Sequence, residues 1–295
     1  MPSAISEESK GLFTSANIVS RFLAFEQIYS PKELGKYVQT LQKQDSNGTD
    51  SRTTDVIVLC ASAILAIPEA VFTWAVQQQT SFETGKGNIV LVLCGGIGPC
   101  TPFVYDAIKA SKKYAPIFKD IEGKPEGQVL KTMAERCYKL KINDNSGKLK
   151  YDGGFTILVS DRSTDCGADA SEVRNVLDDH GISPRSVTVV QDPAMSSRTV
   201  SSFESVYNDQ RASISSWPPT RSDLDNHQEE PQDCNNSMIY KELWSMDRLL
   251  DRVMGDTAHT QHVSGKRMVN GRRVPDEVEN AWSTIMEKNS LRVSC

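Results

Sequence analysis

The stretch from Asn88 to Ala110, NIVLVLCGGIGPCTPFVYDAIKA, decides the fold. Its apolar run, residues 89–93, is too short for a buried helix and stops at glycines, which is typical of a strand buried on both faces. Thr101 and Pro102 then supply an N-cap and a first-turn proline, and apolar residues follow at helical spacing. The stretch therefore predicts a strand, a glycine loop and the start of a helix.

The loop Gly95-Gly96-Ile97-Gly98 is a candidate ligand site. Glycines let a ligand approach the backbone closely, and unpaired amides at a helix N-terminus favour an anionic or strongly polar group. The spacing matches neither the dinucleotide-binding fingerprint nor a P-loop. Taken by itself, the loop fits a plain tight turn as well as a ligand loop.

The same strand, loop and helix pattern occurs four times in the chain. The four strands are expected at 55–60, 89–93, 155–159 and 186–190. Four such units in succession predict a parallel sheet with helices on both faces. A sheet of this kind binds ligands at the carboxyl ends of its strands, where the strand order reverses. Those ends are Ala61-Ser62, Gly95 to Gly98, Asp161 to Cys166 and Gln191 to Arg198.

The strand pattern divides the chain into three parts: an N-terminal helical segment and linker at 1–54, the main domain at 55–215, and a C-terminal loop and helical cap at 216–295. In the N-terminal part, residues 11–44 fit two helices, the second starting at Ser30-Pro31. The C-terminal part begins with a proline-rich, charged stretch at 216–235 and contains a polar, basic segment at 256–274. Its helices are expected at 238–254 and 275–287.

The composition excludes several classes of protein. The 295 residues are 38% hydrophobic and 24% charged, which is typical of a soluble globular chain. A net charge of −5 gives no basic footprint for nucleic acid. Without a signal sequence or an apolar stretch of roughly 20 residues, we expect a cytoplasmic protein that does not associate with membranes. The seven scattered cysteines are typical of reduced thiols.

Three spaced motifs carry a resemblance to a known family: GGIG…T…F…Y…AI from Gly95 to Ile108, ST…CG from Ser163 to Gly167, and VVQDP…M…RT…F from Val189 to Phe203. With further matches around Trp244 and Trp282, about residues 55–288 resemble the YdcF-like family, which includes SanA- and ElyC-type proteins. The bacterial YdcF branch is the most similar. The resemblance implies a Rossmann-like three-layer αβα sandwich with a mostly parallel sheet and a small C-terminal helical part. It also implies binding of S-adenosyl-L-methionine, with no assigned reaction.

The resemblance implies a ligand site made of Gly95, Gly96, Gly98, Thr101, Glu126, Ser163, Thr164, Asp165, Asp169, Asp192 and Arg198. In this site the glycine loop would hold the methionine carboxylate, and an acidic side chain would accept from the ribose hydroxyls or the ammonium group. Arg198 would bind a carboxylate through two parallel hydrogen bonds. A structural ion pair with Asp192 is the alternative for Arg198. For Glu126, stabilisation of a helix N-terminus is a sufficient alternative.

The chain departs from the family pattern at several motif positions. Ser160 stands where the family commonly has an acidic residue, so that only Asp161 remains. Asp165, Ala168 and Asp169 stand where it has Asn, Glu and Asn. If the carboxylate missing at Ala168 holds ligand or does chemistry, the chain binds weakly or is not catalytic.

Three carboxylates, Asp161, Asp165 and Asp169, are spaced four residues apart around a helix start. They could share one cavity or a divalent ion, but capping of the helix N-terminus is the stronger interpretation. Cys166 lies near the same helix end, yet without a nearby histidine in the sequence a catalytic thiol is disfavoured. The four histidines give no metal constellation, and no metal site is expected.

Three functional hypotheses remain. The first is binding of a small nucleotide-like ligand, with S-adenosyl-L-methionine as the leading candidate, at the carboxyl ends of the strands. The second is a hydrolase or transferase acting on a small anionic metabolite, with Asp161 and Glu126 as its acid and base groups. The third is a ligand-free scaffold whose altered motif marks a decayed site.

Overall fold

The computed structural model of the chain describes residues 7–25, 27–28, 30–45, 54–81, 88–143, 154–210, 212–217, 260–263, 266–269 and 272–293. Most of the linker expected before residue 55 lies outside these ranges. So do most of the proline-rich stretch and the whole helix that the sequence predicts between residues 216 and 254.

The main element is a five-stranded parallel sheet with the strand order β3-β2-β1-β4-β5. Its strands are β1 (Thr54–Cys60), β2 (Asn88–Cys94), β3 (Phe155–Ser160), β4 (Pro184–Val190) and β5 (Ser213–Ser216). The first four are the predicted ones. The sequence analysis missed β5, because SISS is short and carries one large apolar residue. Every residue of β1 and β4 is buried, as expected for strands covered on both faces.

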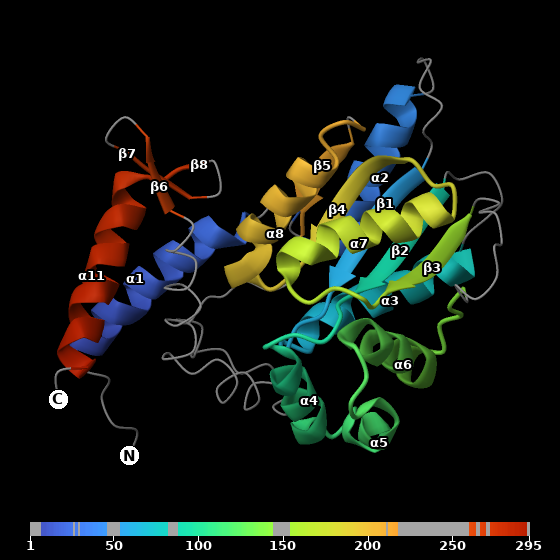
Figure 1. The fold of residues 1–295 in the computed structure, drawn as a ribbon, viewed down its shortest axis with the longest axis horizontal. Helices are drawn as coiled ribbons and strands as arrows, with labels where there is room; N and C mark the ends of the chain where they lie inside the picture. Colours follow the sequence, from blue (N-terminus) through green and yellow to red (C-terminus); the bar gives the residue numbers. More distant parts are fainter. Residues whose placement is uncertain are drawn as a thin grey trace. The chain divides into compact units, whose positions relative to one another are not determined.

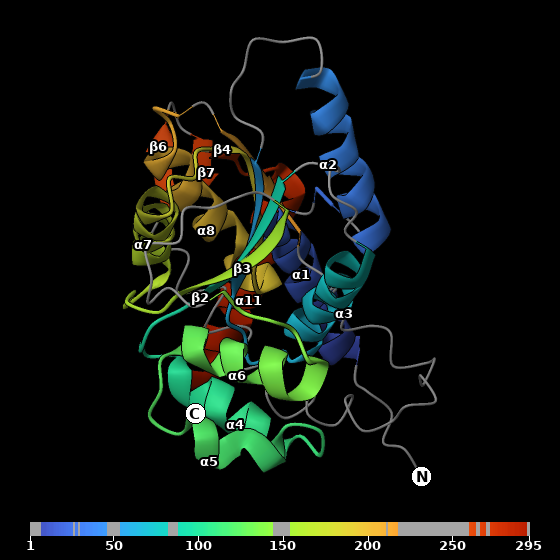
Figure 2. The same cartoon turned by 90° about the vertical axis from the view of Figure 1, so that its right-hand side faces the viewer.

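Helices cover both faces of the sheet, which gives the three-layer Rossmann-like sandwich (Figures 1 and 2). The crossover helices of this unit are α3 (Ala66–Ser81), α4 (Thr101–Ala110), α5 (Phe118–Ile121), α6 (Glu126–Tyr138) and α7 (Cys166–Asp179), with a short 3₁₀ turn η1 (Ala115–Ile117). Figure 2 shows α3 and α7 on opposite sides of the strands. From β1 the chain adds β2 and β3 on one side of the sheet and then crosses to β4 on the other side of β1. Because each crossover is right-handed, this change of direction places α3 and α7 on opposite faces.

The helix α2 (Pro31–Asp45) belongs to the same compact unit as the sheet. The amide of Ile28, just before α2, donates to the carbonyl oxygen of Ser216 at 3.1 Å, and the hydroxyls of Tyr37 and Ser213 are 3.2 Å apart. Both contacts attach the α2 segment to the edge strand β5. Ser30 caps the helix through the Glu33 amide, in agreement with the predicted start.

A second compact unit combines α1 (Glu7–Ala24) with α11 (Asp276–Val293) and a small antiparallel sheet. That sheet contains β6 (Thr260–Val263), β7 (Lys266–Val269) and β8 (Arg272–Arg273). The two helices share an apolar core that includes Leu23, Val278 and Trp282. The sequence analysis described the segment 256–274 only as polar and basic and did not predict its three short strands. Their mostly polar sequences give little apolar alternation to detect.

The two units divide the chain differently from the predicted domains. The unit with α1 and α11 also includes residues 193–198, whereas residues 199–206 group with the sheet. Both ranges belong to the single helix α8 (Pro193–Val206). The predicted N-terminal part is likewise divided, since α1 and α2 belong to different units.

Candidate functional site

The strand order reverses between β1, the central strand of the sheet, and its neighbour β4. Open α/β sheets bind ligands beside the carboxyl ends of the strands at such a reversal. The glycine loop follows β2, the other neighbour of β1, so it lies one strand from the reversal. The Ala61 amide donates to the Cys94 carbonyl oxygen at 3.1 Å and joins the ends of β1 and β2.

The glycine loop is packed tightly against the segment between β3 and α7. A Cβ atom on Gly96 would lie 1.6 Å from the Ser163 carbonyl oxygen, and one on Gly98 would lie 2.8 Å from that of Thr164. The Gly96 amide donates to Ser163 Oγ at 2.9 Å. The expectation of an unpaired amide is therefore wrong at Gly96. These two glycines are required because the chain packs against its own backbone there.

The first amides of α6 also bind the glycine loop. The Glu126 amide donates to the Gly96 carbonyl oxygen at 3.0 Å, and the Gly127 amide donates to that of Gly95 at 2.6 Å. The amides of a first helical turn have no partner within their own helix and attract an acceptor. Here the acceptors are carbonyl groups of the chain itself, so this helix N-terminus orients the loop.

Thr101 and Glu126 meet at the loop, although 25 residues separate them. The Thr101 hydroxyl accepts from the Gly98 amide and donates to Glu126 Oε1, both at 2.9 Å. The helix α4 begins at Thr101, so the predicted N-cap at this residue is wrong by one position. Cys100 is the N-cap, and its side chain makes no capping bond. The second oxygen of half-buried Glu126, Oε2, would lie 2.8 Å from a Cβ atom on Gly95, so this carboxylate faces the loop.

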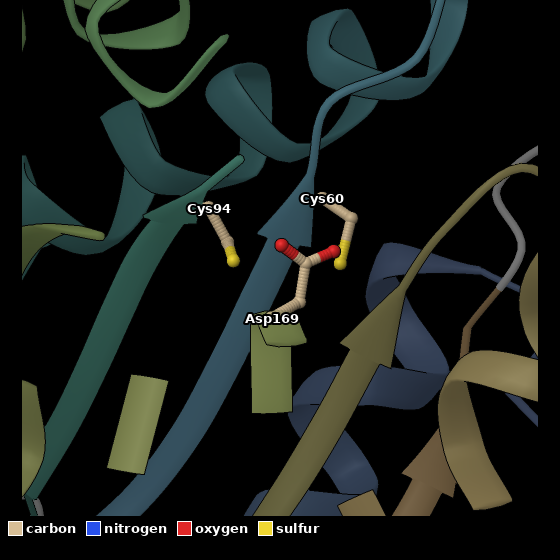
Figure 3. A group of neighbouring side chains, drawn as sticks. All are labelled: Cys60, Cys94 and Asp169. Carbon is tan, nitrogen blue, oxygen red and sulfur yellow. The ribbon is translucent and has the colours of Figure 1, made fainter. Parts of the chain in front are cut away.

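Asp169 lies beneath the loop, with its carboxylate between the thiols of Cys60 and Cys94 (Figure 3). It accepts hydrogen bonds from the Ser163 hydroxyl and the Cys94 thiol. Ser163 in turn accepts from Gly96, so a chain of hydrogen bonds runs from the loop to the buried thiols. Asp169 is 6% exposed, and its carboxylate is turned toward the interior of the sandwich.

Burial raises the pKa values of Asp169, Cys94 and Cys60. It raises the pKa of Asp169, although the bonds from Ser163 and Cys94 partly oppose the rise. The bond to Cys60 and burial raise the pKa of the Cys94 thiol well above its ordinary value. The bond to Cys94 lowers the pKa of Cys60, but burial and the nearby carboxylates raise it on balance. At neutral pH both thiols therefore carry their protons.

The three carboxylates spaced four residues apart have different partners. Asp165 is the N-cap of α7 and accepts from the Gly167 and Ala168 amides at 2.8 and 3.1 Å, which confirms capping at this position. Asp161 accepts from Gln128 Nε2 at 2.7 Å. Throughout the described ranges, the one group of three side chains placed to bind a metal is Cys60, Cys94 and Asp169. The shared site for the three aspartates is not found there.

The remaining predicted residues lie at the end of β4 and in α8. Asp192 is buried and immediately precedes α8, and its amide donates to Gln191 Oε1 at 2.8 Å. Arg198 is half-buried and belongs to the first six residues of α8. Asp192 and Arg198 are in different compact units, so their predicted roles stay predictions. The side chain of Cys166 is outside the described residues.

Cys60 and Cys94 are the site residues that the sequence analysis missed. Each is the buried last residue of a parallel strand, and the strand register pairs one with the other. Aligning the two strands by their final residues would have revealed the pair. It would not have revealed Asp169, which approaches from a helix 75 residues further along the chain.

A comparison with protein-family models finds no match to this chain. Among the described helices, none has both the length and the apolar character needed to cross a membrane.

Proposed function

We propose that the chain is a cytoplasmic YdcF-like protein that binds a small nucleotide-like ligand, with S-adenosyl-L-methionine as the leading candidate. The ligand would bind at the carboxyl ends of the parallel strands. The proposal rests on the resemblance of the motifs and on one observation. Glu126 holds a half-buried carboxylate at this edge of a Rossmann-like sheet, bonded through one oxygen to Thr101 and facing the glycine loop.

The residues fit S-adenosyl-L-methionine in part. Glu126 accepts from Thr101, and a carboxylate can accept several hydrogen bonds at once, as binding of ribose hydroxyls or an ammonium group would require. The amides of Gly96 and Gly98 already donate to Ser163 and Thr101, so they do not fit as donors to the methionine carboxylate. If the ligand binds, other donors must hold that carboxylate.

Calorimetric titration of the full chain with S-adenosyl-L-methionine, S-adenosylhomocysteine and ATP tests the proposal. We expect binding of S-adenosyl-L-methionine, weakened at least about tenfold by Glu126→Gln, because a hydrogen bond to a charged group contributes about 1.5–3 kcal/mol. The amide can still accept from Thr101, so the variant removes the charge and keeps the local structure. Glu122→Gln, at an exposed position just after α5, should bind as the unmodified chain does.

Two other outcomes would contradict the proposal. Equal affinity in the chain and in Glu126→Gln would place the ligand elsewhere. No heat with any of the three compounds would instead favour the ligand-free scaffold, which the internally bonded amides of the loop also fit.

A further inference from the structure

Two thiols and one carboxylate gather under the glycine loop in the sheet unit. The sulfur atoms of Cys60 and Cys94 and an oxygen of Asp169 all lie within 4.8 Å of one another (Figure 3). All three side chains are buried, with 1%, 0% and 6% of their surface exposed. In this structure neither cysteine takes part in a disulfide. A cluster of this composition in the interior needs a chemical explanation.

A fourth polar group lies in the same row of the sheet. The strand register pairs Cys60 with Cys94 and Cys94 with Ser160. Paired residues of parallel strands point to the same face, so Ser160 lies beyond Cys94, two strand spacings from Cys60. Ser160 is 1% exposed, and its hydroxyl has no hydrogen-bond partner in the described part of the chain. The carboxyl ends of three neighbouring strands therefore form a buried polar row, and, of these four side chains, only Cys60, Cys94 and Asp169 are close enough together to share one ion.

We propose that Cys60, Cys94 and Asp169 bind one thiophilic divalent metal ion of the Zn²⁺ class. Two sulfurs and one carboxylate oxygen are a ligand set that Zn²⁺ accepts in tetrahedral sites. Zn–S bonds of about 2.3 Å place two thiolates within roughly 4 Å of each other, so small side-chain shifts bring the three ligands to one ion.

Outer hydrogen bonds already orient one ligand. The Ser163 hydroxyl donates to Asp169 while it accepts from the Gly96 amide. Carboxylate ligands of metal sites are commonly held by such partners. The ion would join the ends of β1 and β2 to the first turns of α7, because each of these elements provides one ligand. With three protein ligands, the fourth position of a tetrahedral ion would be left for a water molecule or another small donor.

Binding has a defined proton balance. Thiolates are the metal ligands, so binding releases the thiol protons of Cys60 and Cys94 to solvent. Affinity should therefore rise with pH, and the bound ion should stabilise the folded chain by mass action.

The test uses the full chain, stripped with a chelator under reducing conditions and then titrated with Co²⁺ and Zn²⁺. We expect one ion per chain, a thiolate-to-cobalt charge-transfer band and a higher melting temperature. In mild denaturant, which lets a thiol reagent reach buried thiols, two thiols should become protected when the ion binds. Cys60→Ser and Cys94→Ser should each remove the band and the stabilisation. Cys137→Ser, a half-buried thiol in α6, should change neither. Asp169→Asn is the milder variant and should weaken binding at least about tenfold, in line with effects at metal sites.

Failure of the reduced chain to take up either ion would overturn the inference. So would an ion that Cys60→Ser and Cys94→Ser both retain with the same band. A Cys60–Cys94 disulfide in the purified chain, with no metal uptake after its reduction, would also overturn it. The protection of two thiols is measured on the unmodified chain, so the test remains decisive if the serine variants fail to fold.

Discussion

At the scale of single residues, the glycines of the loop show what a glycine motif leaves open. From the sequence, Gly95 to Gly98 fit a plain tight turn as well as a ligand loop. The structure fills the space at Gly96 and Gly98 with the carbonyl oxygens of Ser163 and Thr164. A glycine requirement looks the same in sequence whether the neighbour is a ligand or the protein's own backbone.

Gly96→Ala should destabilise the chain by at least about 3 kcal/mol, because the new methyl group would overlap the Ser163 carbonyl oxygen and force the backbone to move. Gly35→Ala is the matched control. Gly35 lies within α2 with no atom within 4 Å of a new Cβ, so the change should stabilise by about 0.5–1 kcal/mol. Urea denaturation of both variants measures the difference. Equal stability of Gly96→Ala and the unmodified chain would show that the loop does not pack as described.

Asp165 and Asp169 show what the capping preference of aspartate predicts and what it does not. The preference of aspartate for helix N-termini predicted the cap at Asp165 correctly. The same preference could not predict that Asp169, one turn later, turns inward to two thiols. That contact depends on which residues end β1 and β2, and therefore on tertiary structure.

At the scale of elements, a partly buried polar network connects α3 and α6 on one face of the sheet. The Tyr114 hydroxyl donates to Glu69 Oε1 of α3 at 2.9 Å and lies 2.7 Å from the Tyr138 hydroxyl of α6. Lys113 Nζ donates to the Tyr138 hydroxyl at 2.8 Å and lies 4.4 Å from the centre of its ring. The network fixes α3, the turn after α4, and α6 in one arrangement. Because α6 begins at Glu126, it also helps to hold the candidate site.

This network predicts a loss of stability at alkaline pH. Burial raises the pKa of Tyr114 above its ordinary value of 10.0, and the bond to Tyr138 and the charge of Glu69 add to the rise. The folded state therefore keeps this proton after the unfolded state has lost it. The contribution is fully present below pH 10, and the free energy of unfolding should fall as the pH rises above 10.

Tyr114→Phe should reduce that alkaline decline and also cost about 1 kcal/mol or more near neutral pH through the lost hydrogen bonds. Tyr37→Phe, in α2, leaves the network intact and should keep the full decline. Denaturant unfolding between pH 8 and 11 measures both variants. If Tyr114→Phe shows the same slope as the unmodified chain, the ionisation of another group is responsible.

Element boundaries were predictable where apolar periodicity was strong. The four long strands and the start of helix α11 agree with the prediction within a few residues, whereas α11 continues beyond its predicted C-terminal end. The strands β5 to β8 were not predicted. They have two to four mostly polar residues each, and their formation depends on pairing with neighbours that the local sequence does not specify.

At the scale of the whole molecule, the succession of strands and helices was enough to predict the class of fold. The division into compact units was not predictable, because α1 packs with α11 from the opposite end of the chain. Contacts across that sequence distance leave no local pattern. The candidate site was predictable in part. The motifs contain residues that meet in the structure, Gly96 with Ser163 and Thr101 with Glu126. Which donors remain for a ligand depends on how the backbone packs.

We propose that a small nucleotide-like ligand binds at the carboxyl edge of the sheet, over the glycine loop. Backbone amide NMR of the full chain during titration with S-adenosyl-L-methionine tests this proposal. We expect saturable shifts concentrated at Ile97, Gly98, Thr101 and Glu126, with Gly35 in α2 unchanged. Saturating shifts confined to other parts of the chain, or no shifts at millimolar ligand, would contradict it.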